Sequence, residues 1–264
     1  MNRIAATFQA CRDGNRKALV MFVSAGDPSL PVTERLIDAI IAAGADLIEI
    51  GVPFSDPMAD GPAIQAASQR ALASGTTLRK ILDLCARVRT RTQTPLILFS
   101  YYNVILQYGV HDLARDAAAA GIDGWLLVDV PAEEADEVRP AMTAQGLQWI
   151  TLLAPTTPPE RAARLAAQAE GFVYYITVTG VTGVRAELPD DLATHLEHVR
   201  EIARVPVVAG FGISNPEMAR RVAAHADGVV VGSALVNTLA RAAAPEQGIS
   251  ACAELVRALA AALK

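Results

Sequence analysis

Lysine is scarce in this chain of 264 residues, where it occurs only at Lys17, Lys80 and Lys264. None of the three follows a predicted strand, so no lysine is placed to form a Schiff base with a carbonyl substrate. Serine and cysteine nucleophiles lack a partner histidine at a strand end. The histidines all lie in or just before predicted helices, which argues against a zinc site and predicts no metal centre. They are His111, His195, His198 and His225.

Disulfide patterns, long apolar runs and clusters of one charge are also missing. The cysteines, Cys11, Cys85 and Cys252, stand far apart without C-x-x-C spacing, so a reducing cytoplasm is expected. No stretch approaches 18 uninterrupted apolar residues, and the N-terminal residues lack the apolar core of a signal peptide. The net charge of −5 without a Lys/Arg-rich run argues against nucleic acid or an anionic membrane as a partner. We therefore expect a cytoplasmic protein with a small-molecule ligand.

Apolar runs of strand length recur along the chain, and each is followed by an Ala-rich segment of helical length. This alternation predicts an α/β fold, a parallel sheet covered by helices. Eight runs favour a closed β/α (TIM) barrel over a doubly wound sheet, and the length fits a single barrel domain over 1–264. Extra short helices are predicted at 4–13, 63–73 and 235–241. The runs are 18–24, 46–51, 95–101, 125–130, 147–153, 172–178, 205–212 and 227–233.

Two carboxylates lie where a parallel barrel would place its chemistry. Glu49 interrupts the apolar strand LIEIG, and Asp60 lies in the Pro/Gly-rich loop that follows. Side chains alternate along a strand, so Leu47, Glu49 and Gly51 share one face. Burial raises the pKa of a carboxyl group toward neutrality, where the group both takes and gives a proton. From the strand alone, a buried glutamate satisfied by a neighbouring donor is an equally good interpretation.

Glycine-rich loops follow three consecutive predicted strands: TGVTG at 179–183, GFGIS at 210–214 and VGSAL at 231–235. Glycine lets backbone N–H groups approach an oxyanion, and the loops after the last two barrel strands commonly bind phosphate. One glycine alone is more often a turn residue, but three such loops predict a phosphate cradle. Its candidate donors are Gly183, Gly212, Gly232 and Ser233. Combined with the missing lysine and metal site, this cradle predicts proton transfer by carboxylates on a phosphorylated substrate.

Several segments resemble the tryptophan synthase α-chain family. They are ADLIEIGVPFSDPMADGPAIQ at 45–65, FSYYN at 99–103, LVDVPAEE at 127–134, GSA at 232–234 and the first two glycine loops. The resemblance covers essentially the whole chain, and its first segment is highly specific. It implies a β/α-barrel lyase of L-tryptophan biosynthesis. The implied reaction is the retro-aldol cleavage of indole-3-glycerol phosphate into indole and glyceraldehyde 3-phosphate.

The resemblance also implies a role for each carboxylate. Glu49 would protonate indole C3 and help remove the proton of the glycerol 3′-hydroxyl, while Asp60 would hold the indole N–H. Both roles fit a dry, preorganised site. Thr182 matches the family residue that bonds the second carboxylate when its loop closes. Val178 stands where some members carry arginine, so loop closure is expected to be stabilised differently here.

Apolar and aromatic residues near strand ends are the predicted lining of the indole pocket. For any one of them, a place in the barrel core is about as good an interpretation. Tyr174 and Phe22 rank highest. The set comprises Phe22, Phe99, Tyr101, Leu126, Tyr174 and, in the second glycine loop, Phe211.

A partner chain is implied as well. Family members pass indole to a β chain, which holds pyridoxal phosphate and joins indole to serine in a complex of two α and two β chains. Pro53, Asp56, Pro57 and Asn103 match family positions at that contact. No cofactor is expected in this chain itself.

Two alternatives remain open at this point. One is a different phosphosugar substrate, because other barrels bind such substrates through similar loops. The aromatic pocket and the spacing of the two carboxylates speak against it. The other is a ligand-sensing role without catalysis, in which the chain only activates the β chain. The presence of both carboxylates speaks against that role.

Overall fold

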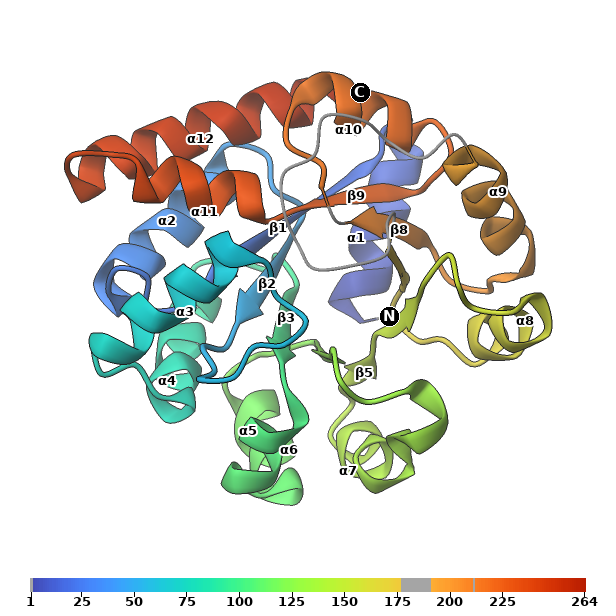
Figure 1. The fold of residues 1–264 in the computed structure, drawn as a ribbon, viewed down its shortest axis with the longest axis horizontal. Coiled ribbons are helices and arrows are strands. Elements are labelled where there is room, and N and C mark those ends of the chain that lie inside the picture. Colours follow the sequence, from blue (N-terminus) through green and yellow to red (C-terminus); the bar gives the residue numbers. More distant parts are fainter. Residues whose placement is uncertain (1, 177–190, 211) are drawn as a thin grey trace.

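Strands and helices alternate along the chain in the computed structural model, which describes residues 2–176, 191–210 and 212–264. All strand pairs are parallel, in the order β5-β4-β3-β2-β1-β9-β8-β7-β6. Because β5 and β6 are consecutive pieces of one segment, the two ends of this order meet. The sheet curves into a barrel with helices around its outside (Figure 1), which confirms the predicted TIM-type fold.

The bounds of the elements are as follows. The strands are β1 (Ala18–Ser24), β2 (Leu47–Gly51), β3 (Leu96–Ser100), β4 (Gly124–Leu127), β5 (Gln148–Trp149), β6 (Thr151–Leu153), β7 (Val173–Ile176), β8 (Val207–Gly210) and β9 (Gly228–Val231). The helices are α1 (Arg3–Asp13), α2 (Leu30–Ala42), α3 (Pro62–Ala73), α4 (Leu78–Arg89), α5 (Tyr102–Tyr108), α6 (Val110–Ala119), α7 (Arg139–Ala144), α8 (Pro159–Ala167), α9 (Leu192–Ile202), α10 (Pro216–Ala223), α11 (Ser233–Ala240) and α12 (Pro245–Ala262), with a 3-10 turn, η1 (Ala132–Glu137).

The described residues form nine strands, where the sequence predicts eight. The difference arises in the run 147–153, which is interrupted at Ile150. The N–H of Ile150 bonds the Trp125 carbonyl at 2.9 Å, and its side chain packs inside the barrel. One half of the run then pairs with β4 and the other with β7. Together β5 and β6 occupy one position in the barrel wall, so the correction concerns a break within one strand.

The three extra helices predicted from the sequence are present as α1, α3 and α11. The first begins after Asn2, whose side chain accepts the N–H of Ala5 at 2.8 Å, as an N-cap should. The second begins at Pro62, because proline suits the first turn of a helix. No described helix is long and apolar enough to cross a membrane.

The alternation of side chains divides the core into two layers. In β1, Leu19 and Met21 pack toward the helices, while Val20 and Phe22 point into the barrel. The interior is filled by side chains from most strands, so it is a packed core and not a channel. Helix α1 closes one end of it, where the rings of Phe8 and Phe172 lie 5.8 Å apart. A ligand of the barrel must therefore bind at the opposite end, beyond the carboxyl ends of the strands.

Four carboxylates join neighbouring strands at the amino-terminal face of the barrel. Each lies one to three residues before a strand, accepts a backbone N–H from the neighbouring position of the barrel wall, and pairs with an arginine. They are Asp46 (Leu19 N–H, 2.9 Å; Arg16), Asp123 (Leu96 N–H, 2.9 Å; Arg89), Glu170 (Trp149 N–H, 3.0 Å; Arg139) and Asp227 (Val207 N–H, 2.9 Å; Arg200). These contacts stabilise the face remote from the strand ends that carry chemistry.

Candidate functional site

Glu49 lies in the middle of β2 with its side chain directed into the barrel. In the strand register it stands beside Phe22 of β1 and Ile97 of β3. It is fully buried, and neither carboxyl oxygen has a hydrogen-bond partner among the described residues. Burial raises the pKa of Glu49 to about 8. The group is therefore largely protonated near neutral pH and can give a proton before it takes one back.

Asp60 lies in the loop between β2 and α3 and is also buried. Its Oδ2 accepts a hydrogen bond from the Tyr101 hydroxyl at 3.1 Å, while Oδ1 has no partner among the described residues. Burial, which outweighs the lowering effect of the hydrogen bond from Tyr101, raises the pKa of Asp60 to about 6. Two hydrogen bonds fix the backbone of Asp60. Gln65 Nε2 donates to the Asp60 carbonyl at 2.8 Å, and the Asp60 N–H donates to the Pro57 carbonyl at 3.0 Å. Near neutral pH Asp60 is mostly ionised.

Tyr174 shows that the two carboxylates share one site. Its pKa is raised first by burial and then by the negative charges of Glu49 and Asp60. Beside it in the barrel interior, the rings of Phe22 and Phe99 meet edge to face with centroids 5.1 Å apart. All five described members of the predicted indole pocket are buried: Phe22, Phe99, Tyr101, Leu126 and Tyr174. Their contact with indole stays a prediction.

The described part of the phosphate cradle lies after β8 and β9. Gly212 has φ of +89°, a conformation that favours glycine. Gly232 is the N-cap of α11 and Ser233 is its first residue, so free backbone N–H groups point out of the helix there. Thr182, Gly183, Phe211 and Val178 lie outside the described residues. The placement of Gly212, Gly232 and Ser233 agrees with a phosphate site at this end of the barrel, and phosphate binding itself stays a prediction.

Comparison with known proteins gives the family. A family model described as the tryptophan synthase alpha chain matches residues 8–264. The chain belongs to the tryptophan synthase α-chain family. It is 55% identical over 248 residues to the tryptophan synthase alpha chain of Geobacter sulfurreducens, with 94% of each chain covered. It is 47% identical over 258 residues to that of Gloeobacter violaceus, covering 97% of this chain and 93% of the relative.

Solved structures agree with this assignment. The crystal structure of tryptophan synthase subunit alpha from Legionella pneumophila str. Paris superimposes with a TM-score of 0.92 at 38% identity, covering 100% of this chain and 98% of that one. The resemblance found in the sequence is therefore confirmed, and so is the lyase activity that it implies. The chain is an enzyme that cleaves indole-3-glycerol phosphate.

Sequence reasoning missed two glycines that shape this α-chain site. A Cβ atom at Gly51 would overlap the ring of Phe22, and one at Gly210 would overlap the hydroxyl of Tyr174. Both glycines end strands, so the rings of neighbouring strands lie directly over their backbone. A glycine closing an apolar strand is the signal that could have found them.

An ion pair between a buried aspartate and an exposed arginine, at the same end of the barrel, was also missed. Asp27, in the loop after β1, accepts two hydrogen bonds from Arg70 of α3, at 2.7 and 2.8 Å. The pair holds the first strand's loop against the helix that follows Asp60. No spacing rule predicts it, because the two residues are 43 positions apart.

Of the residues predicted at the α-chain contact with a β chain, Asn103 lines a groove. Asn103 is exposed and lines a cavity of about 610 Å³ with Phe54, Arg79 and Tyr108. Of the loop residues, Asp56 is exposed, Pro57 is half-buried and Pro53 is buried. Two large apolar side chains close by in sequence are exposed to solvent, Met58 at 78% and Leu106 at 54%.

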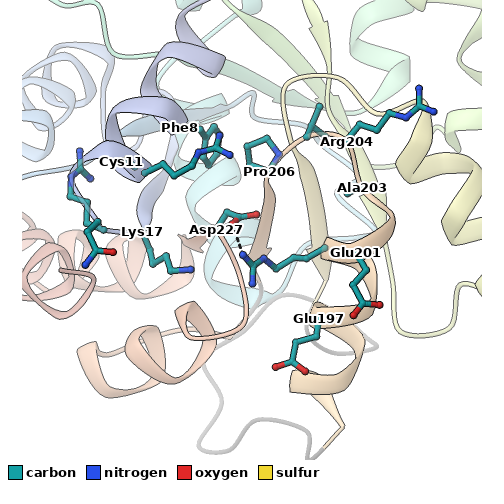
Figure 2. Close-up of a pocket in the computed structure, with 14 residues that line it drawn as sticks. Phe8, Cys11, Lys17, Glu197, Glu201, Ala203, Arg204, Pro206 and Asp227 are labelled. Atoms are coloured by element: carbon teal, nitrogen blue, oxygen red, sulfur yellow. Dashed lines mark hydrogen bonds and ion pairs between the residues drawn. The ribbon is translucent and has the colours of Figure 1, made fainter.

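A larger cavity, of about 700 Å³, lies at the opposite face (Figure 2). Lys17, Pro206 and Asp227 line it, and each directly precedes a strand. It is therefore far along the barrel axis from Asp60 and does not belong to the lyase site. Among the described residues, no group of three His, Cys, Asp or Glu side chains is arranged to hold a metal ion.

Proposed function

We propose that Glu49 and Asp60 perform the cleavage of indole-3-glycerol phosphate as a proton shuttle and a fixed carboxylate. The observation that carries this proposal is a pair of buried carboxyl groups in one site whose pKa values differ. The pKa is about 8 for Glu49 and about 6 for Asp60. Two titratable groups whose environments push their pKa values apart are the mark of an acid and a base.

The reaction then follows from the protonation states. Protonated Glu49 gives its proton to indole C3, while ionised Asp60 accepts the indole N–H and stabilises the positive charge on the ring. Glu49, now a carboxylate, takes the proton of the 3′-hydroxyl. The electron pair of the broken C–C bond returns to the ring, and the hydroxyl carbon becomes the aldehyde of glyceraldehyde 3-phosphate. Burial strengthens each of these charge interactions.

The phosphate group is proposed to bind at the other side of the barrel mouth. Backbone N–H groups at Gly212, Gly232 and Ser233 would hold it, together with Gly183, and Thr182 would act on Asp60 when its loop closes. The position of Gly232 and Ser233 at the start of α11 supports this assignment, since helix N-termini favour anions.

A β chain of tryptophan synthase is the proposed partner, in a complex of two α and two β chains. The groove lined by Phe54 and Asn103, with exposed Met58 and Leu106 close by in sequence, supports docking there. Pyridoxal phosphate would belong to the β chain, and this chain would work without a cofactor of its own. The three described cysteines are free and buried, in keeping with a cytoplasmic enzyme.

Substitution of each carboxylate tests the proposal. Glu49→Gln keeps the shape of the side chain but removes the exchangeable proton, so we expect indole production to fall by ~10²–10⁴ with substrate binding retained. Asp60→Asn should also slow indole release. Asp56→Asn, in the same loop but exposed, is the matched control and should leave the rate of the isolated chain unchanged. Retention of about a tenth of the wild-type rate by Glu49→Gln would contradict its assignment as the shuttle.

A further inference from the structure

The hydroxyl of Tyr101 touches Asp60 and its loop at the same time. It donates to Asp60 Oδ2 at 3.1 Å and accepts the backbone N–H of Ala59 at 3.1 Å. Burial, followed by the charge of Asp60, raises the pKa of Tyr101 well above its ordinary value, so the hydroxyl keeps its proton and remains a donor. A single oxygen thus fixes both the carboxylate and the backbone beside it.

Tyr101 is itself held from two sides. Its ring packs on that of Phe54, with centroids 5.1 Å apart and planes inclined at 32°. Its backbone leads into α5, where the N–H of Tyr102 is bound by both carboxylate oxygens of Asp129, at 2.9 and 3.2 Å. The hydroxyl therefore has little freedom to move away from Asp60.

Phe54 connects this arrangement with the surface. It is half-buried, one side against Tyr101, and it also lines the groove that contains Asn103 and Tyr108. The chain of contacts runs from the groove through the two packed rings to one oxygen of Asp60.

We infer that Tyr101 is a positioning residue, whose hydroxyl holds Asp60 Oδ2 so that Oδ1 is the oxygen offered to the indole N–H. This rests on the proposed role of Asp60. Oδ1 is buried and has no partner among the described residues, so a substrate donor satisfies it at no cost in competing contacts. Because a fixed acceptor needs no reorganisation during the reaction, the loss of Tyr101's hydroxyl must weaken the stabilisation of the ring cation.

Tyr101→Phe is the direct test, because it removes one oxygen and keeps the ring on Phe54. We expect kcat to fall by about tenfold or more, as for the loss of one hydrogen bond to a charged group. On the acid side of the dependence of kcat/KM on pH, the rate falls as Asp60 takes up a proton. This acid limb should move to higher pH in the variant, since the bond from Tyr101 lowers the pKa of Asp60. The other titratable groups near Asp60 and Tyr101 are Glu49, Tyr174 and Asp129, and all remain in the variant.

Tyr102→Phe is the matched control. That neighbouring tyrosine donates instead to Glu137 at 2.9 Å, on the outside of the barrel, and its loss should shift neither limb. Phe54→Leu is a second variant, which keeps the Tyr101 hydroxyl but removes the ring packed against it. It should lower kcat in the same direction as Tyr101→Phe, by a smaller factor.

The outcomes separate the inference from the proposed function. If Asp60→Asn stops indole formation while Tyr101→Phe keeps the wild-type kcat and pH profile, the positioning role is wrong and the role of Asp60 stands. If Asp60→Asn itself keeps the wild-type rate, the proposed function is wrong, and the inference that rests on it is wrong as well. Loss of kcat in Tyr101→Phe with an unmoved acid limb, in a variant with wild-type thermal unfolding, would also overturn the inference.

Discussion

Glu49 gains its chemistry from isolation, because a fully buried carboxyl group without a hydrogen-bond partner among the described residues is costly to ionise. The same isolation makes the stability of the fold depend on pH. The folded state holds the proton with a pKa of about 8, whereas an unfolded chain releases it near the ordinary value of 4.5. The contribution of Glu49 to stability is therefore complete below pH 4.5 and lost as the pH rises from there to about 8.

Glu49→Gln should therefore flatten the dependence of stability on pH. In that window the wild type loses up to about 1.4 kcal/mol of unfolding free energy per pH unit through this group. The variant should gain on the wild type as the pH rises, which urea unfolding at a series of pH values measures. Glu254→Gln, on the exposed side of α12, is the control and should follow the wild type. Parallel curves for wild type and Glu49→Gln would show that Glu49 does not titrate in this range.

The lyase rate should show a bell-shaped dependence on pH. Activity requires ionised Asp60 and protonated Glu49, so kcat/KM should rise through a pKa of about 6 and fall through one of about 8. Steady-state indole formation across this range measures both limbs. In Asp60→Asn, the residual activity should lack the acid limb. A rate that keeps rising above pH 8 would contradict the role of Glu49 as the initial acid.

The sequence predicts Glu49 well and Asp60's environment poorly. Alternation along β2 is a local rule, so it puts Glu49 on one face with Leu47 and Gly51, and the apolar run predicts that the side chain is buried. Only the structure shows that this face points into the barrel. The bond between Tyr101 and Asp60 joins residues 41 positions apart through an irregular loop, and no periodicity describes it. The sequence could nominate Tyr101 only as an aromatic near a strand end.

At the scale of elements, the strand runs were predictable because a barrel strand is apolar on both faces. The break at Ile150 was not, since a run with one irregular residue has the same composition as a continuous one. The extra helices could be predicted because each carries the periodicity or entry signals of a helix. What composition does not reveal is which loop faces which, and that decides the phosphate cradle.

Gly212 offers a test of that cradle with a matched pair of variants. Its φ of +89° is one that asparagine and aspartate tolerate better than other side chains. Gly212→Asp and Gly212→Asn should then share most of the strain and differ in charge. We expect calorimetry to show a much larger loss of affinity for glycerol phosphate in Gly212→Asp than in Gly212→Asn. Equal affinities in two folded variants would place the phosphate elsewhere.

At the scale of the whole molecule, the groove lined by Phe54 and Asn103 leads to a prediction about activation. Asp56 and Asn103 are exposed, and neither is among the residues proposed to touch substrate. Asp56→Lys or Asn103→Trp should therefore weaken mutual activation with a β chain more than it changes the basal lyase rate. Docking of the β chain would act by stabilising one conformation of the loop that carries Asp60.

Mixing experiments measure this effect. Size-exclusion chromatography with a cognate β chain, together with indole assays at several mixing ratios, gives affinity and activation separately. Glu217→Lys, on an exposed turn of α10, provides a control of the same charge change away from the groove. The absence of a complex at micromolar concentrations, or a lyase rate that ignores the β chain, would refute the docking proposal.

The four carboxylates at the amino-terminal face also have a consequence for how such a chain can be rearranged. Each clamps two strands that follow one another: β1 to β2, β3 to β4, the interrupted fifth strand to β7, and β8 to β9. At this face the strands are thus joined in four pairs. Circular permutants that open between these pairs, as between β2 and β3, keep every clamp within an unbroken stretch of chain. Permutants opened between β3 and β4 must form one clamp across the new ends, and we expect them to refold more slowly.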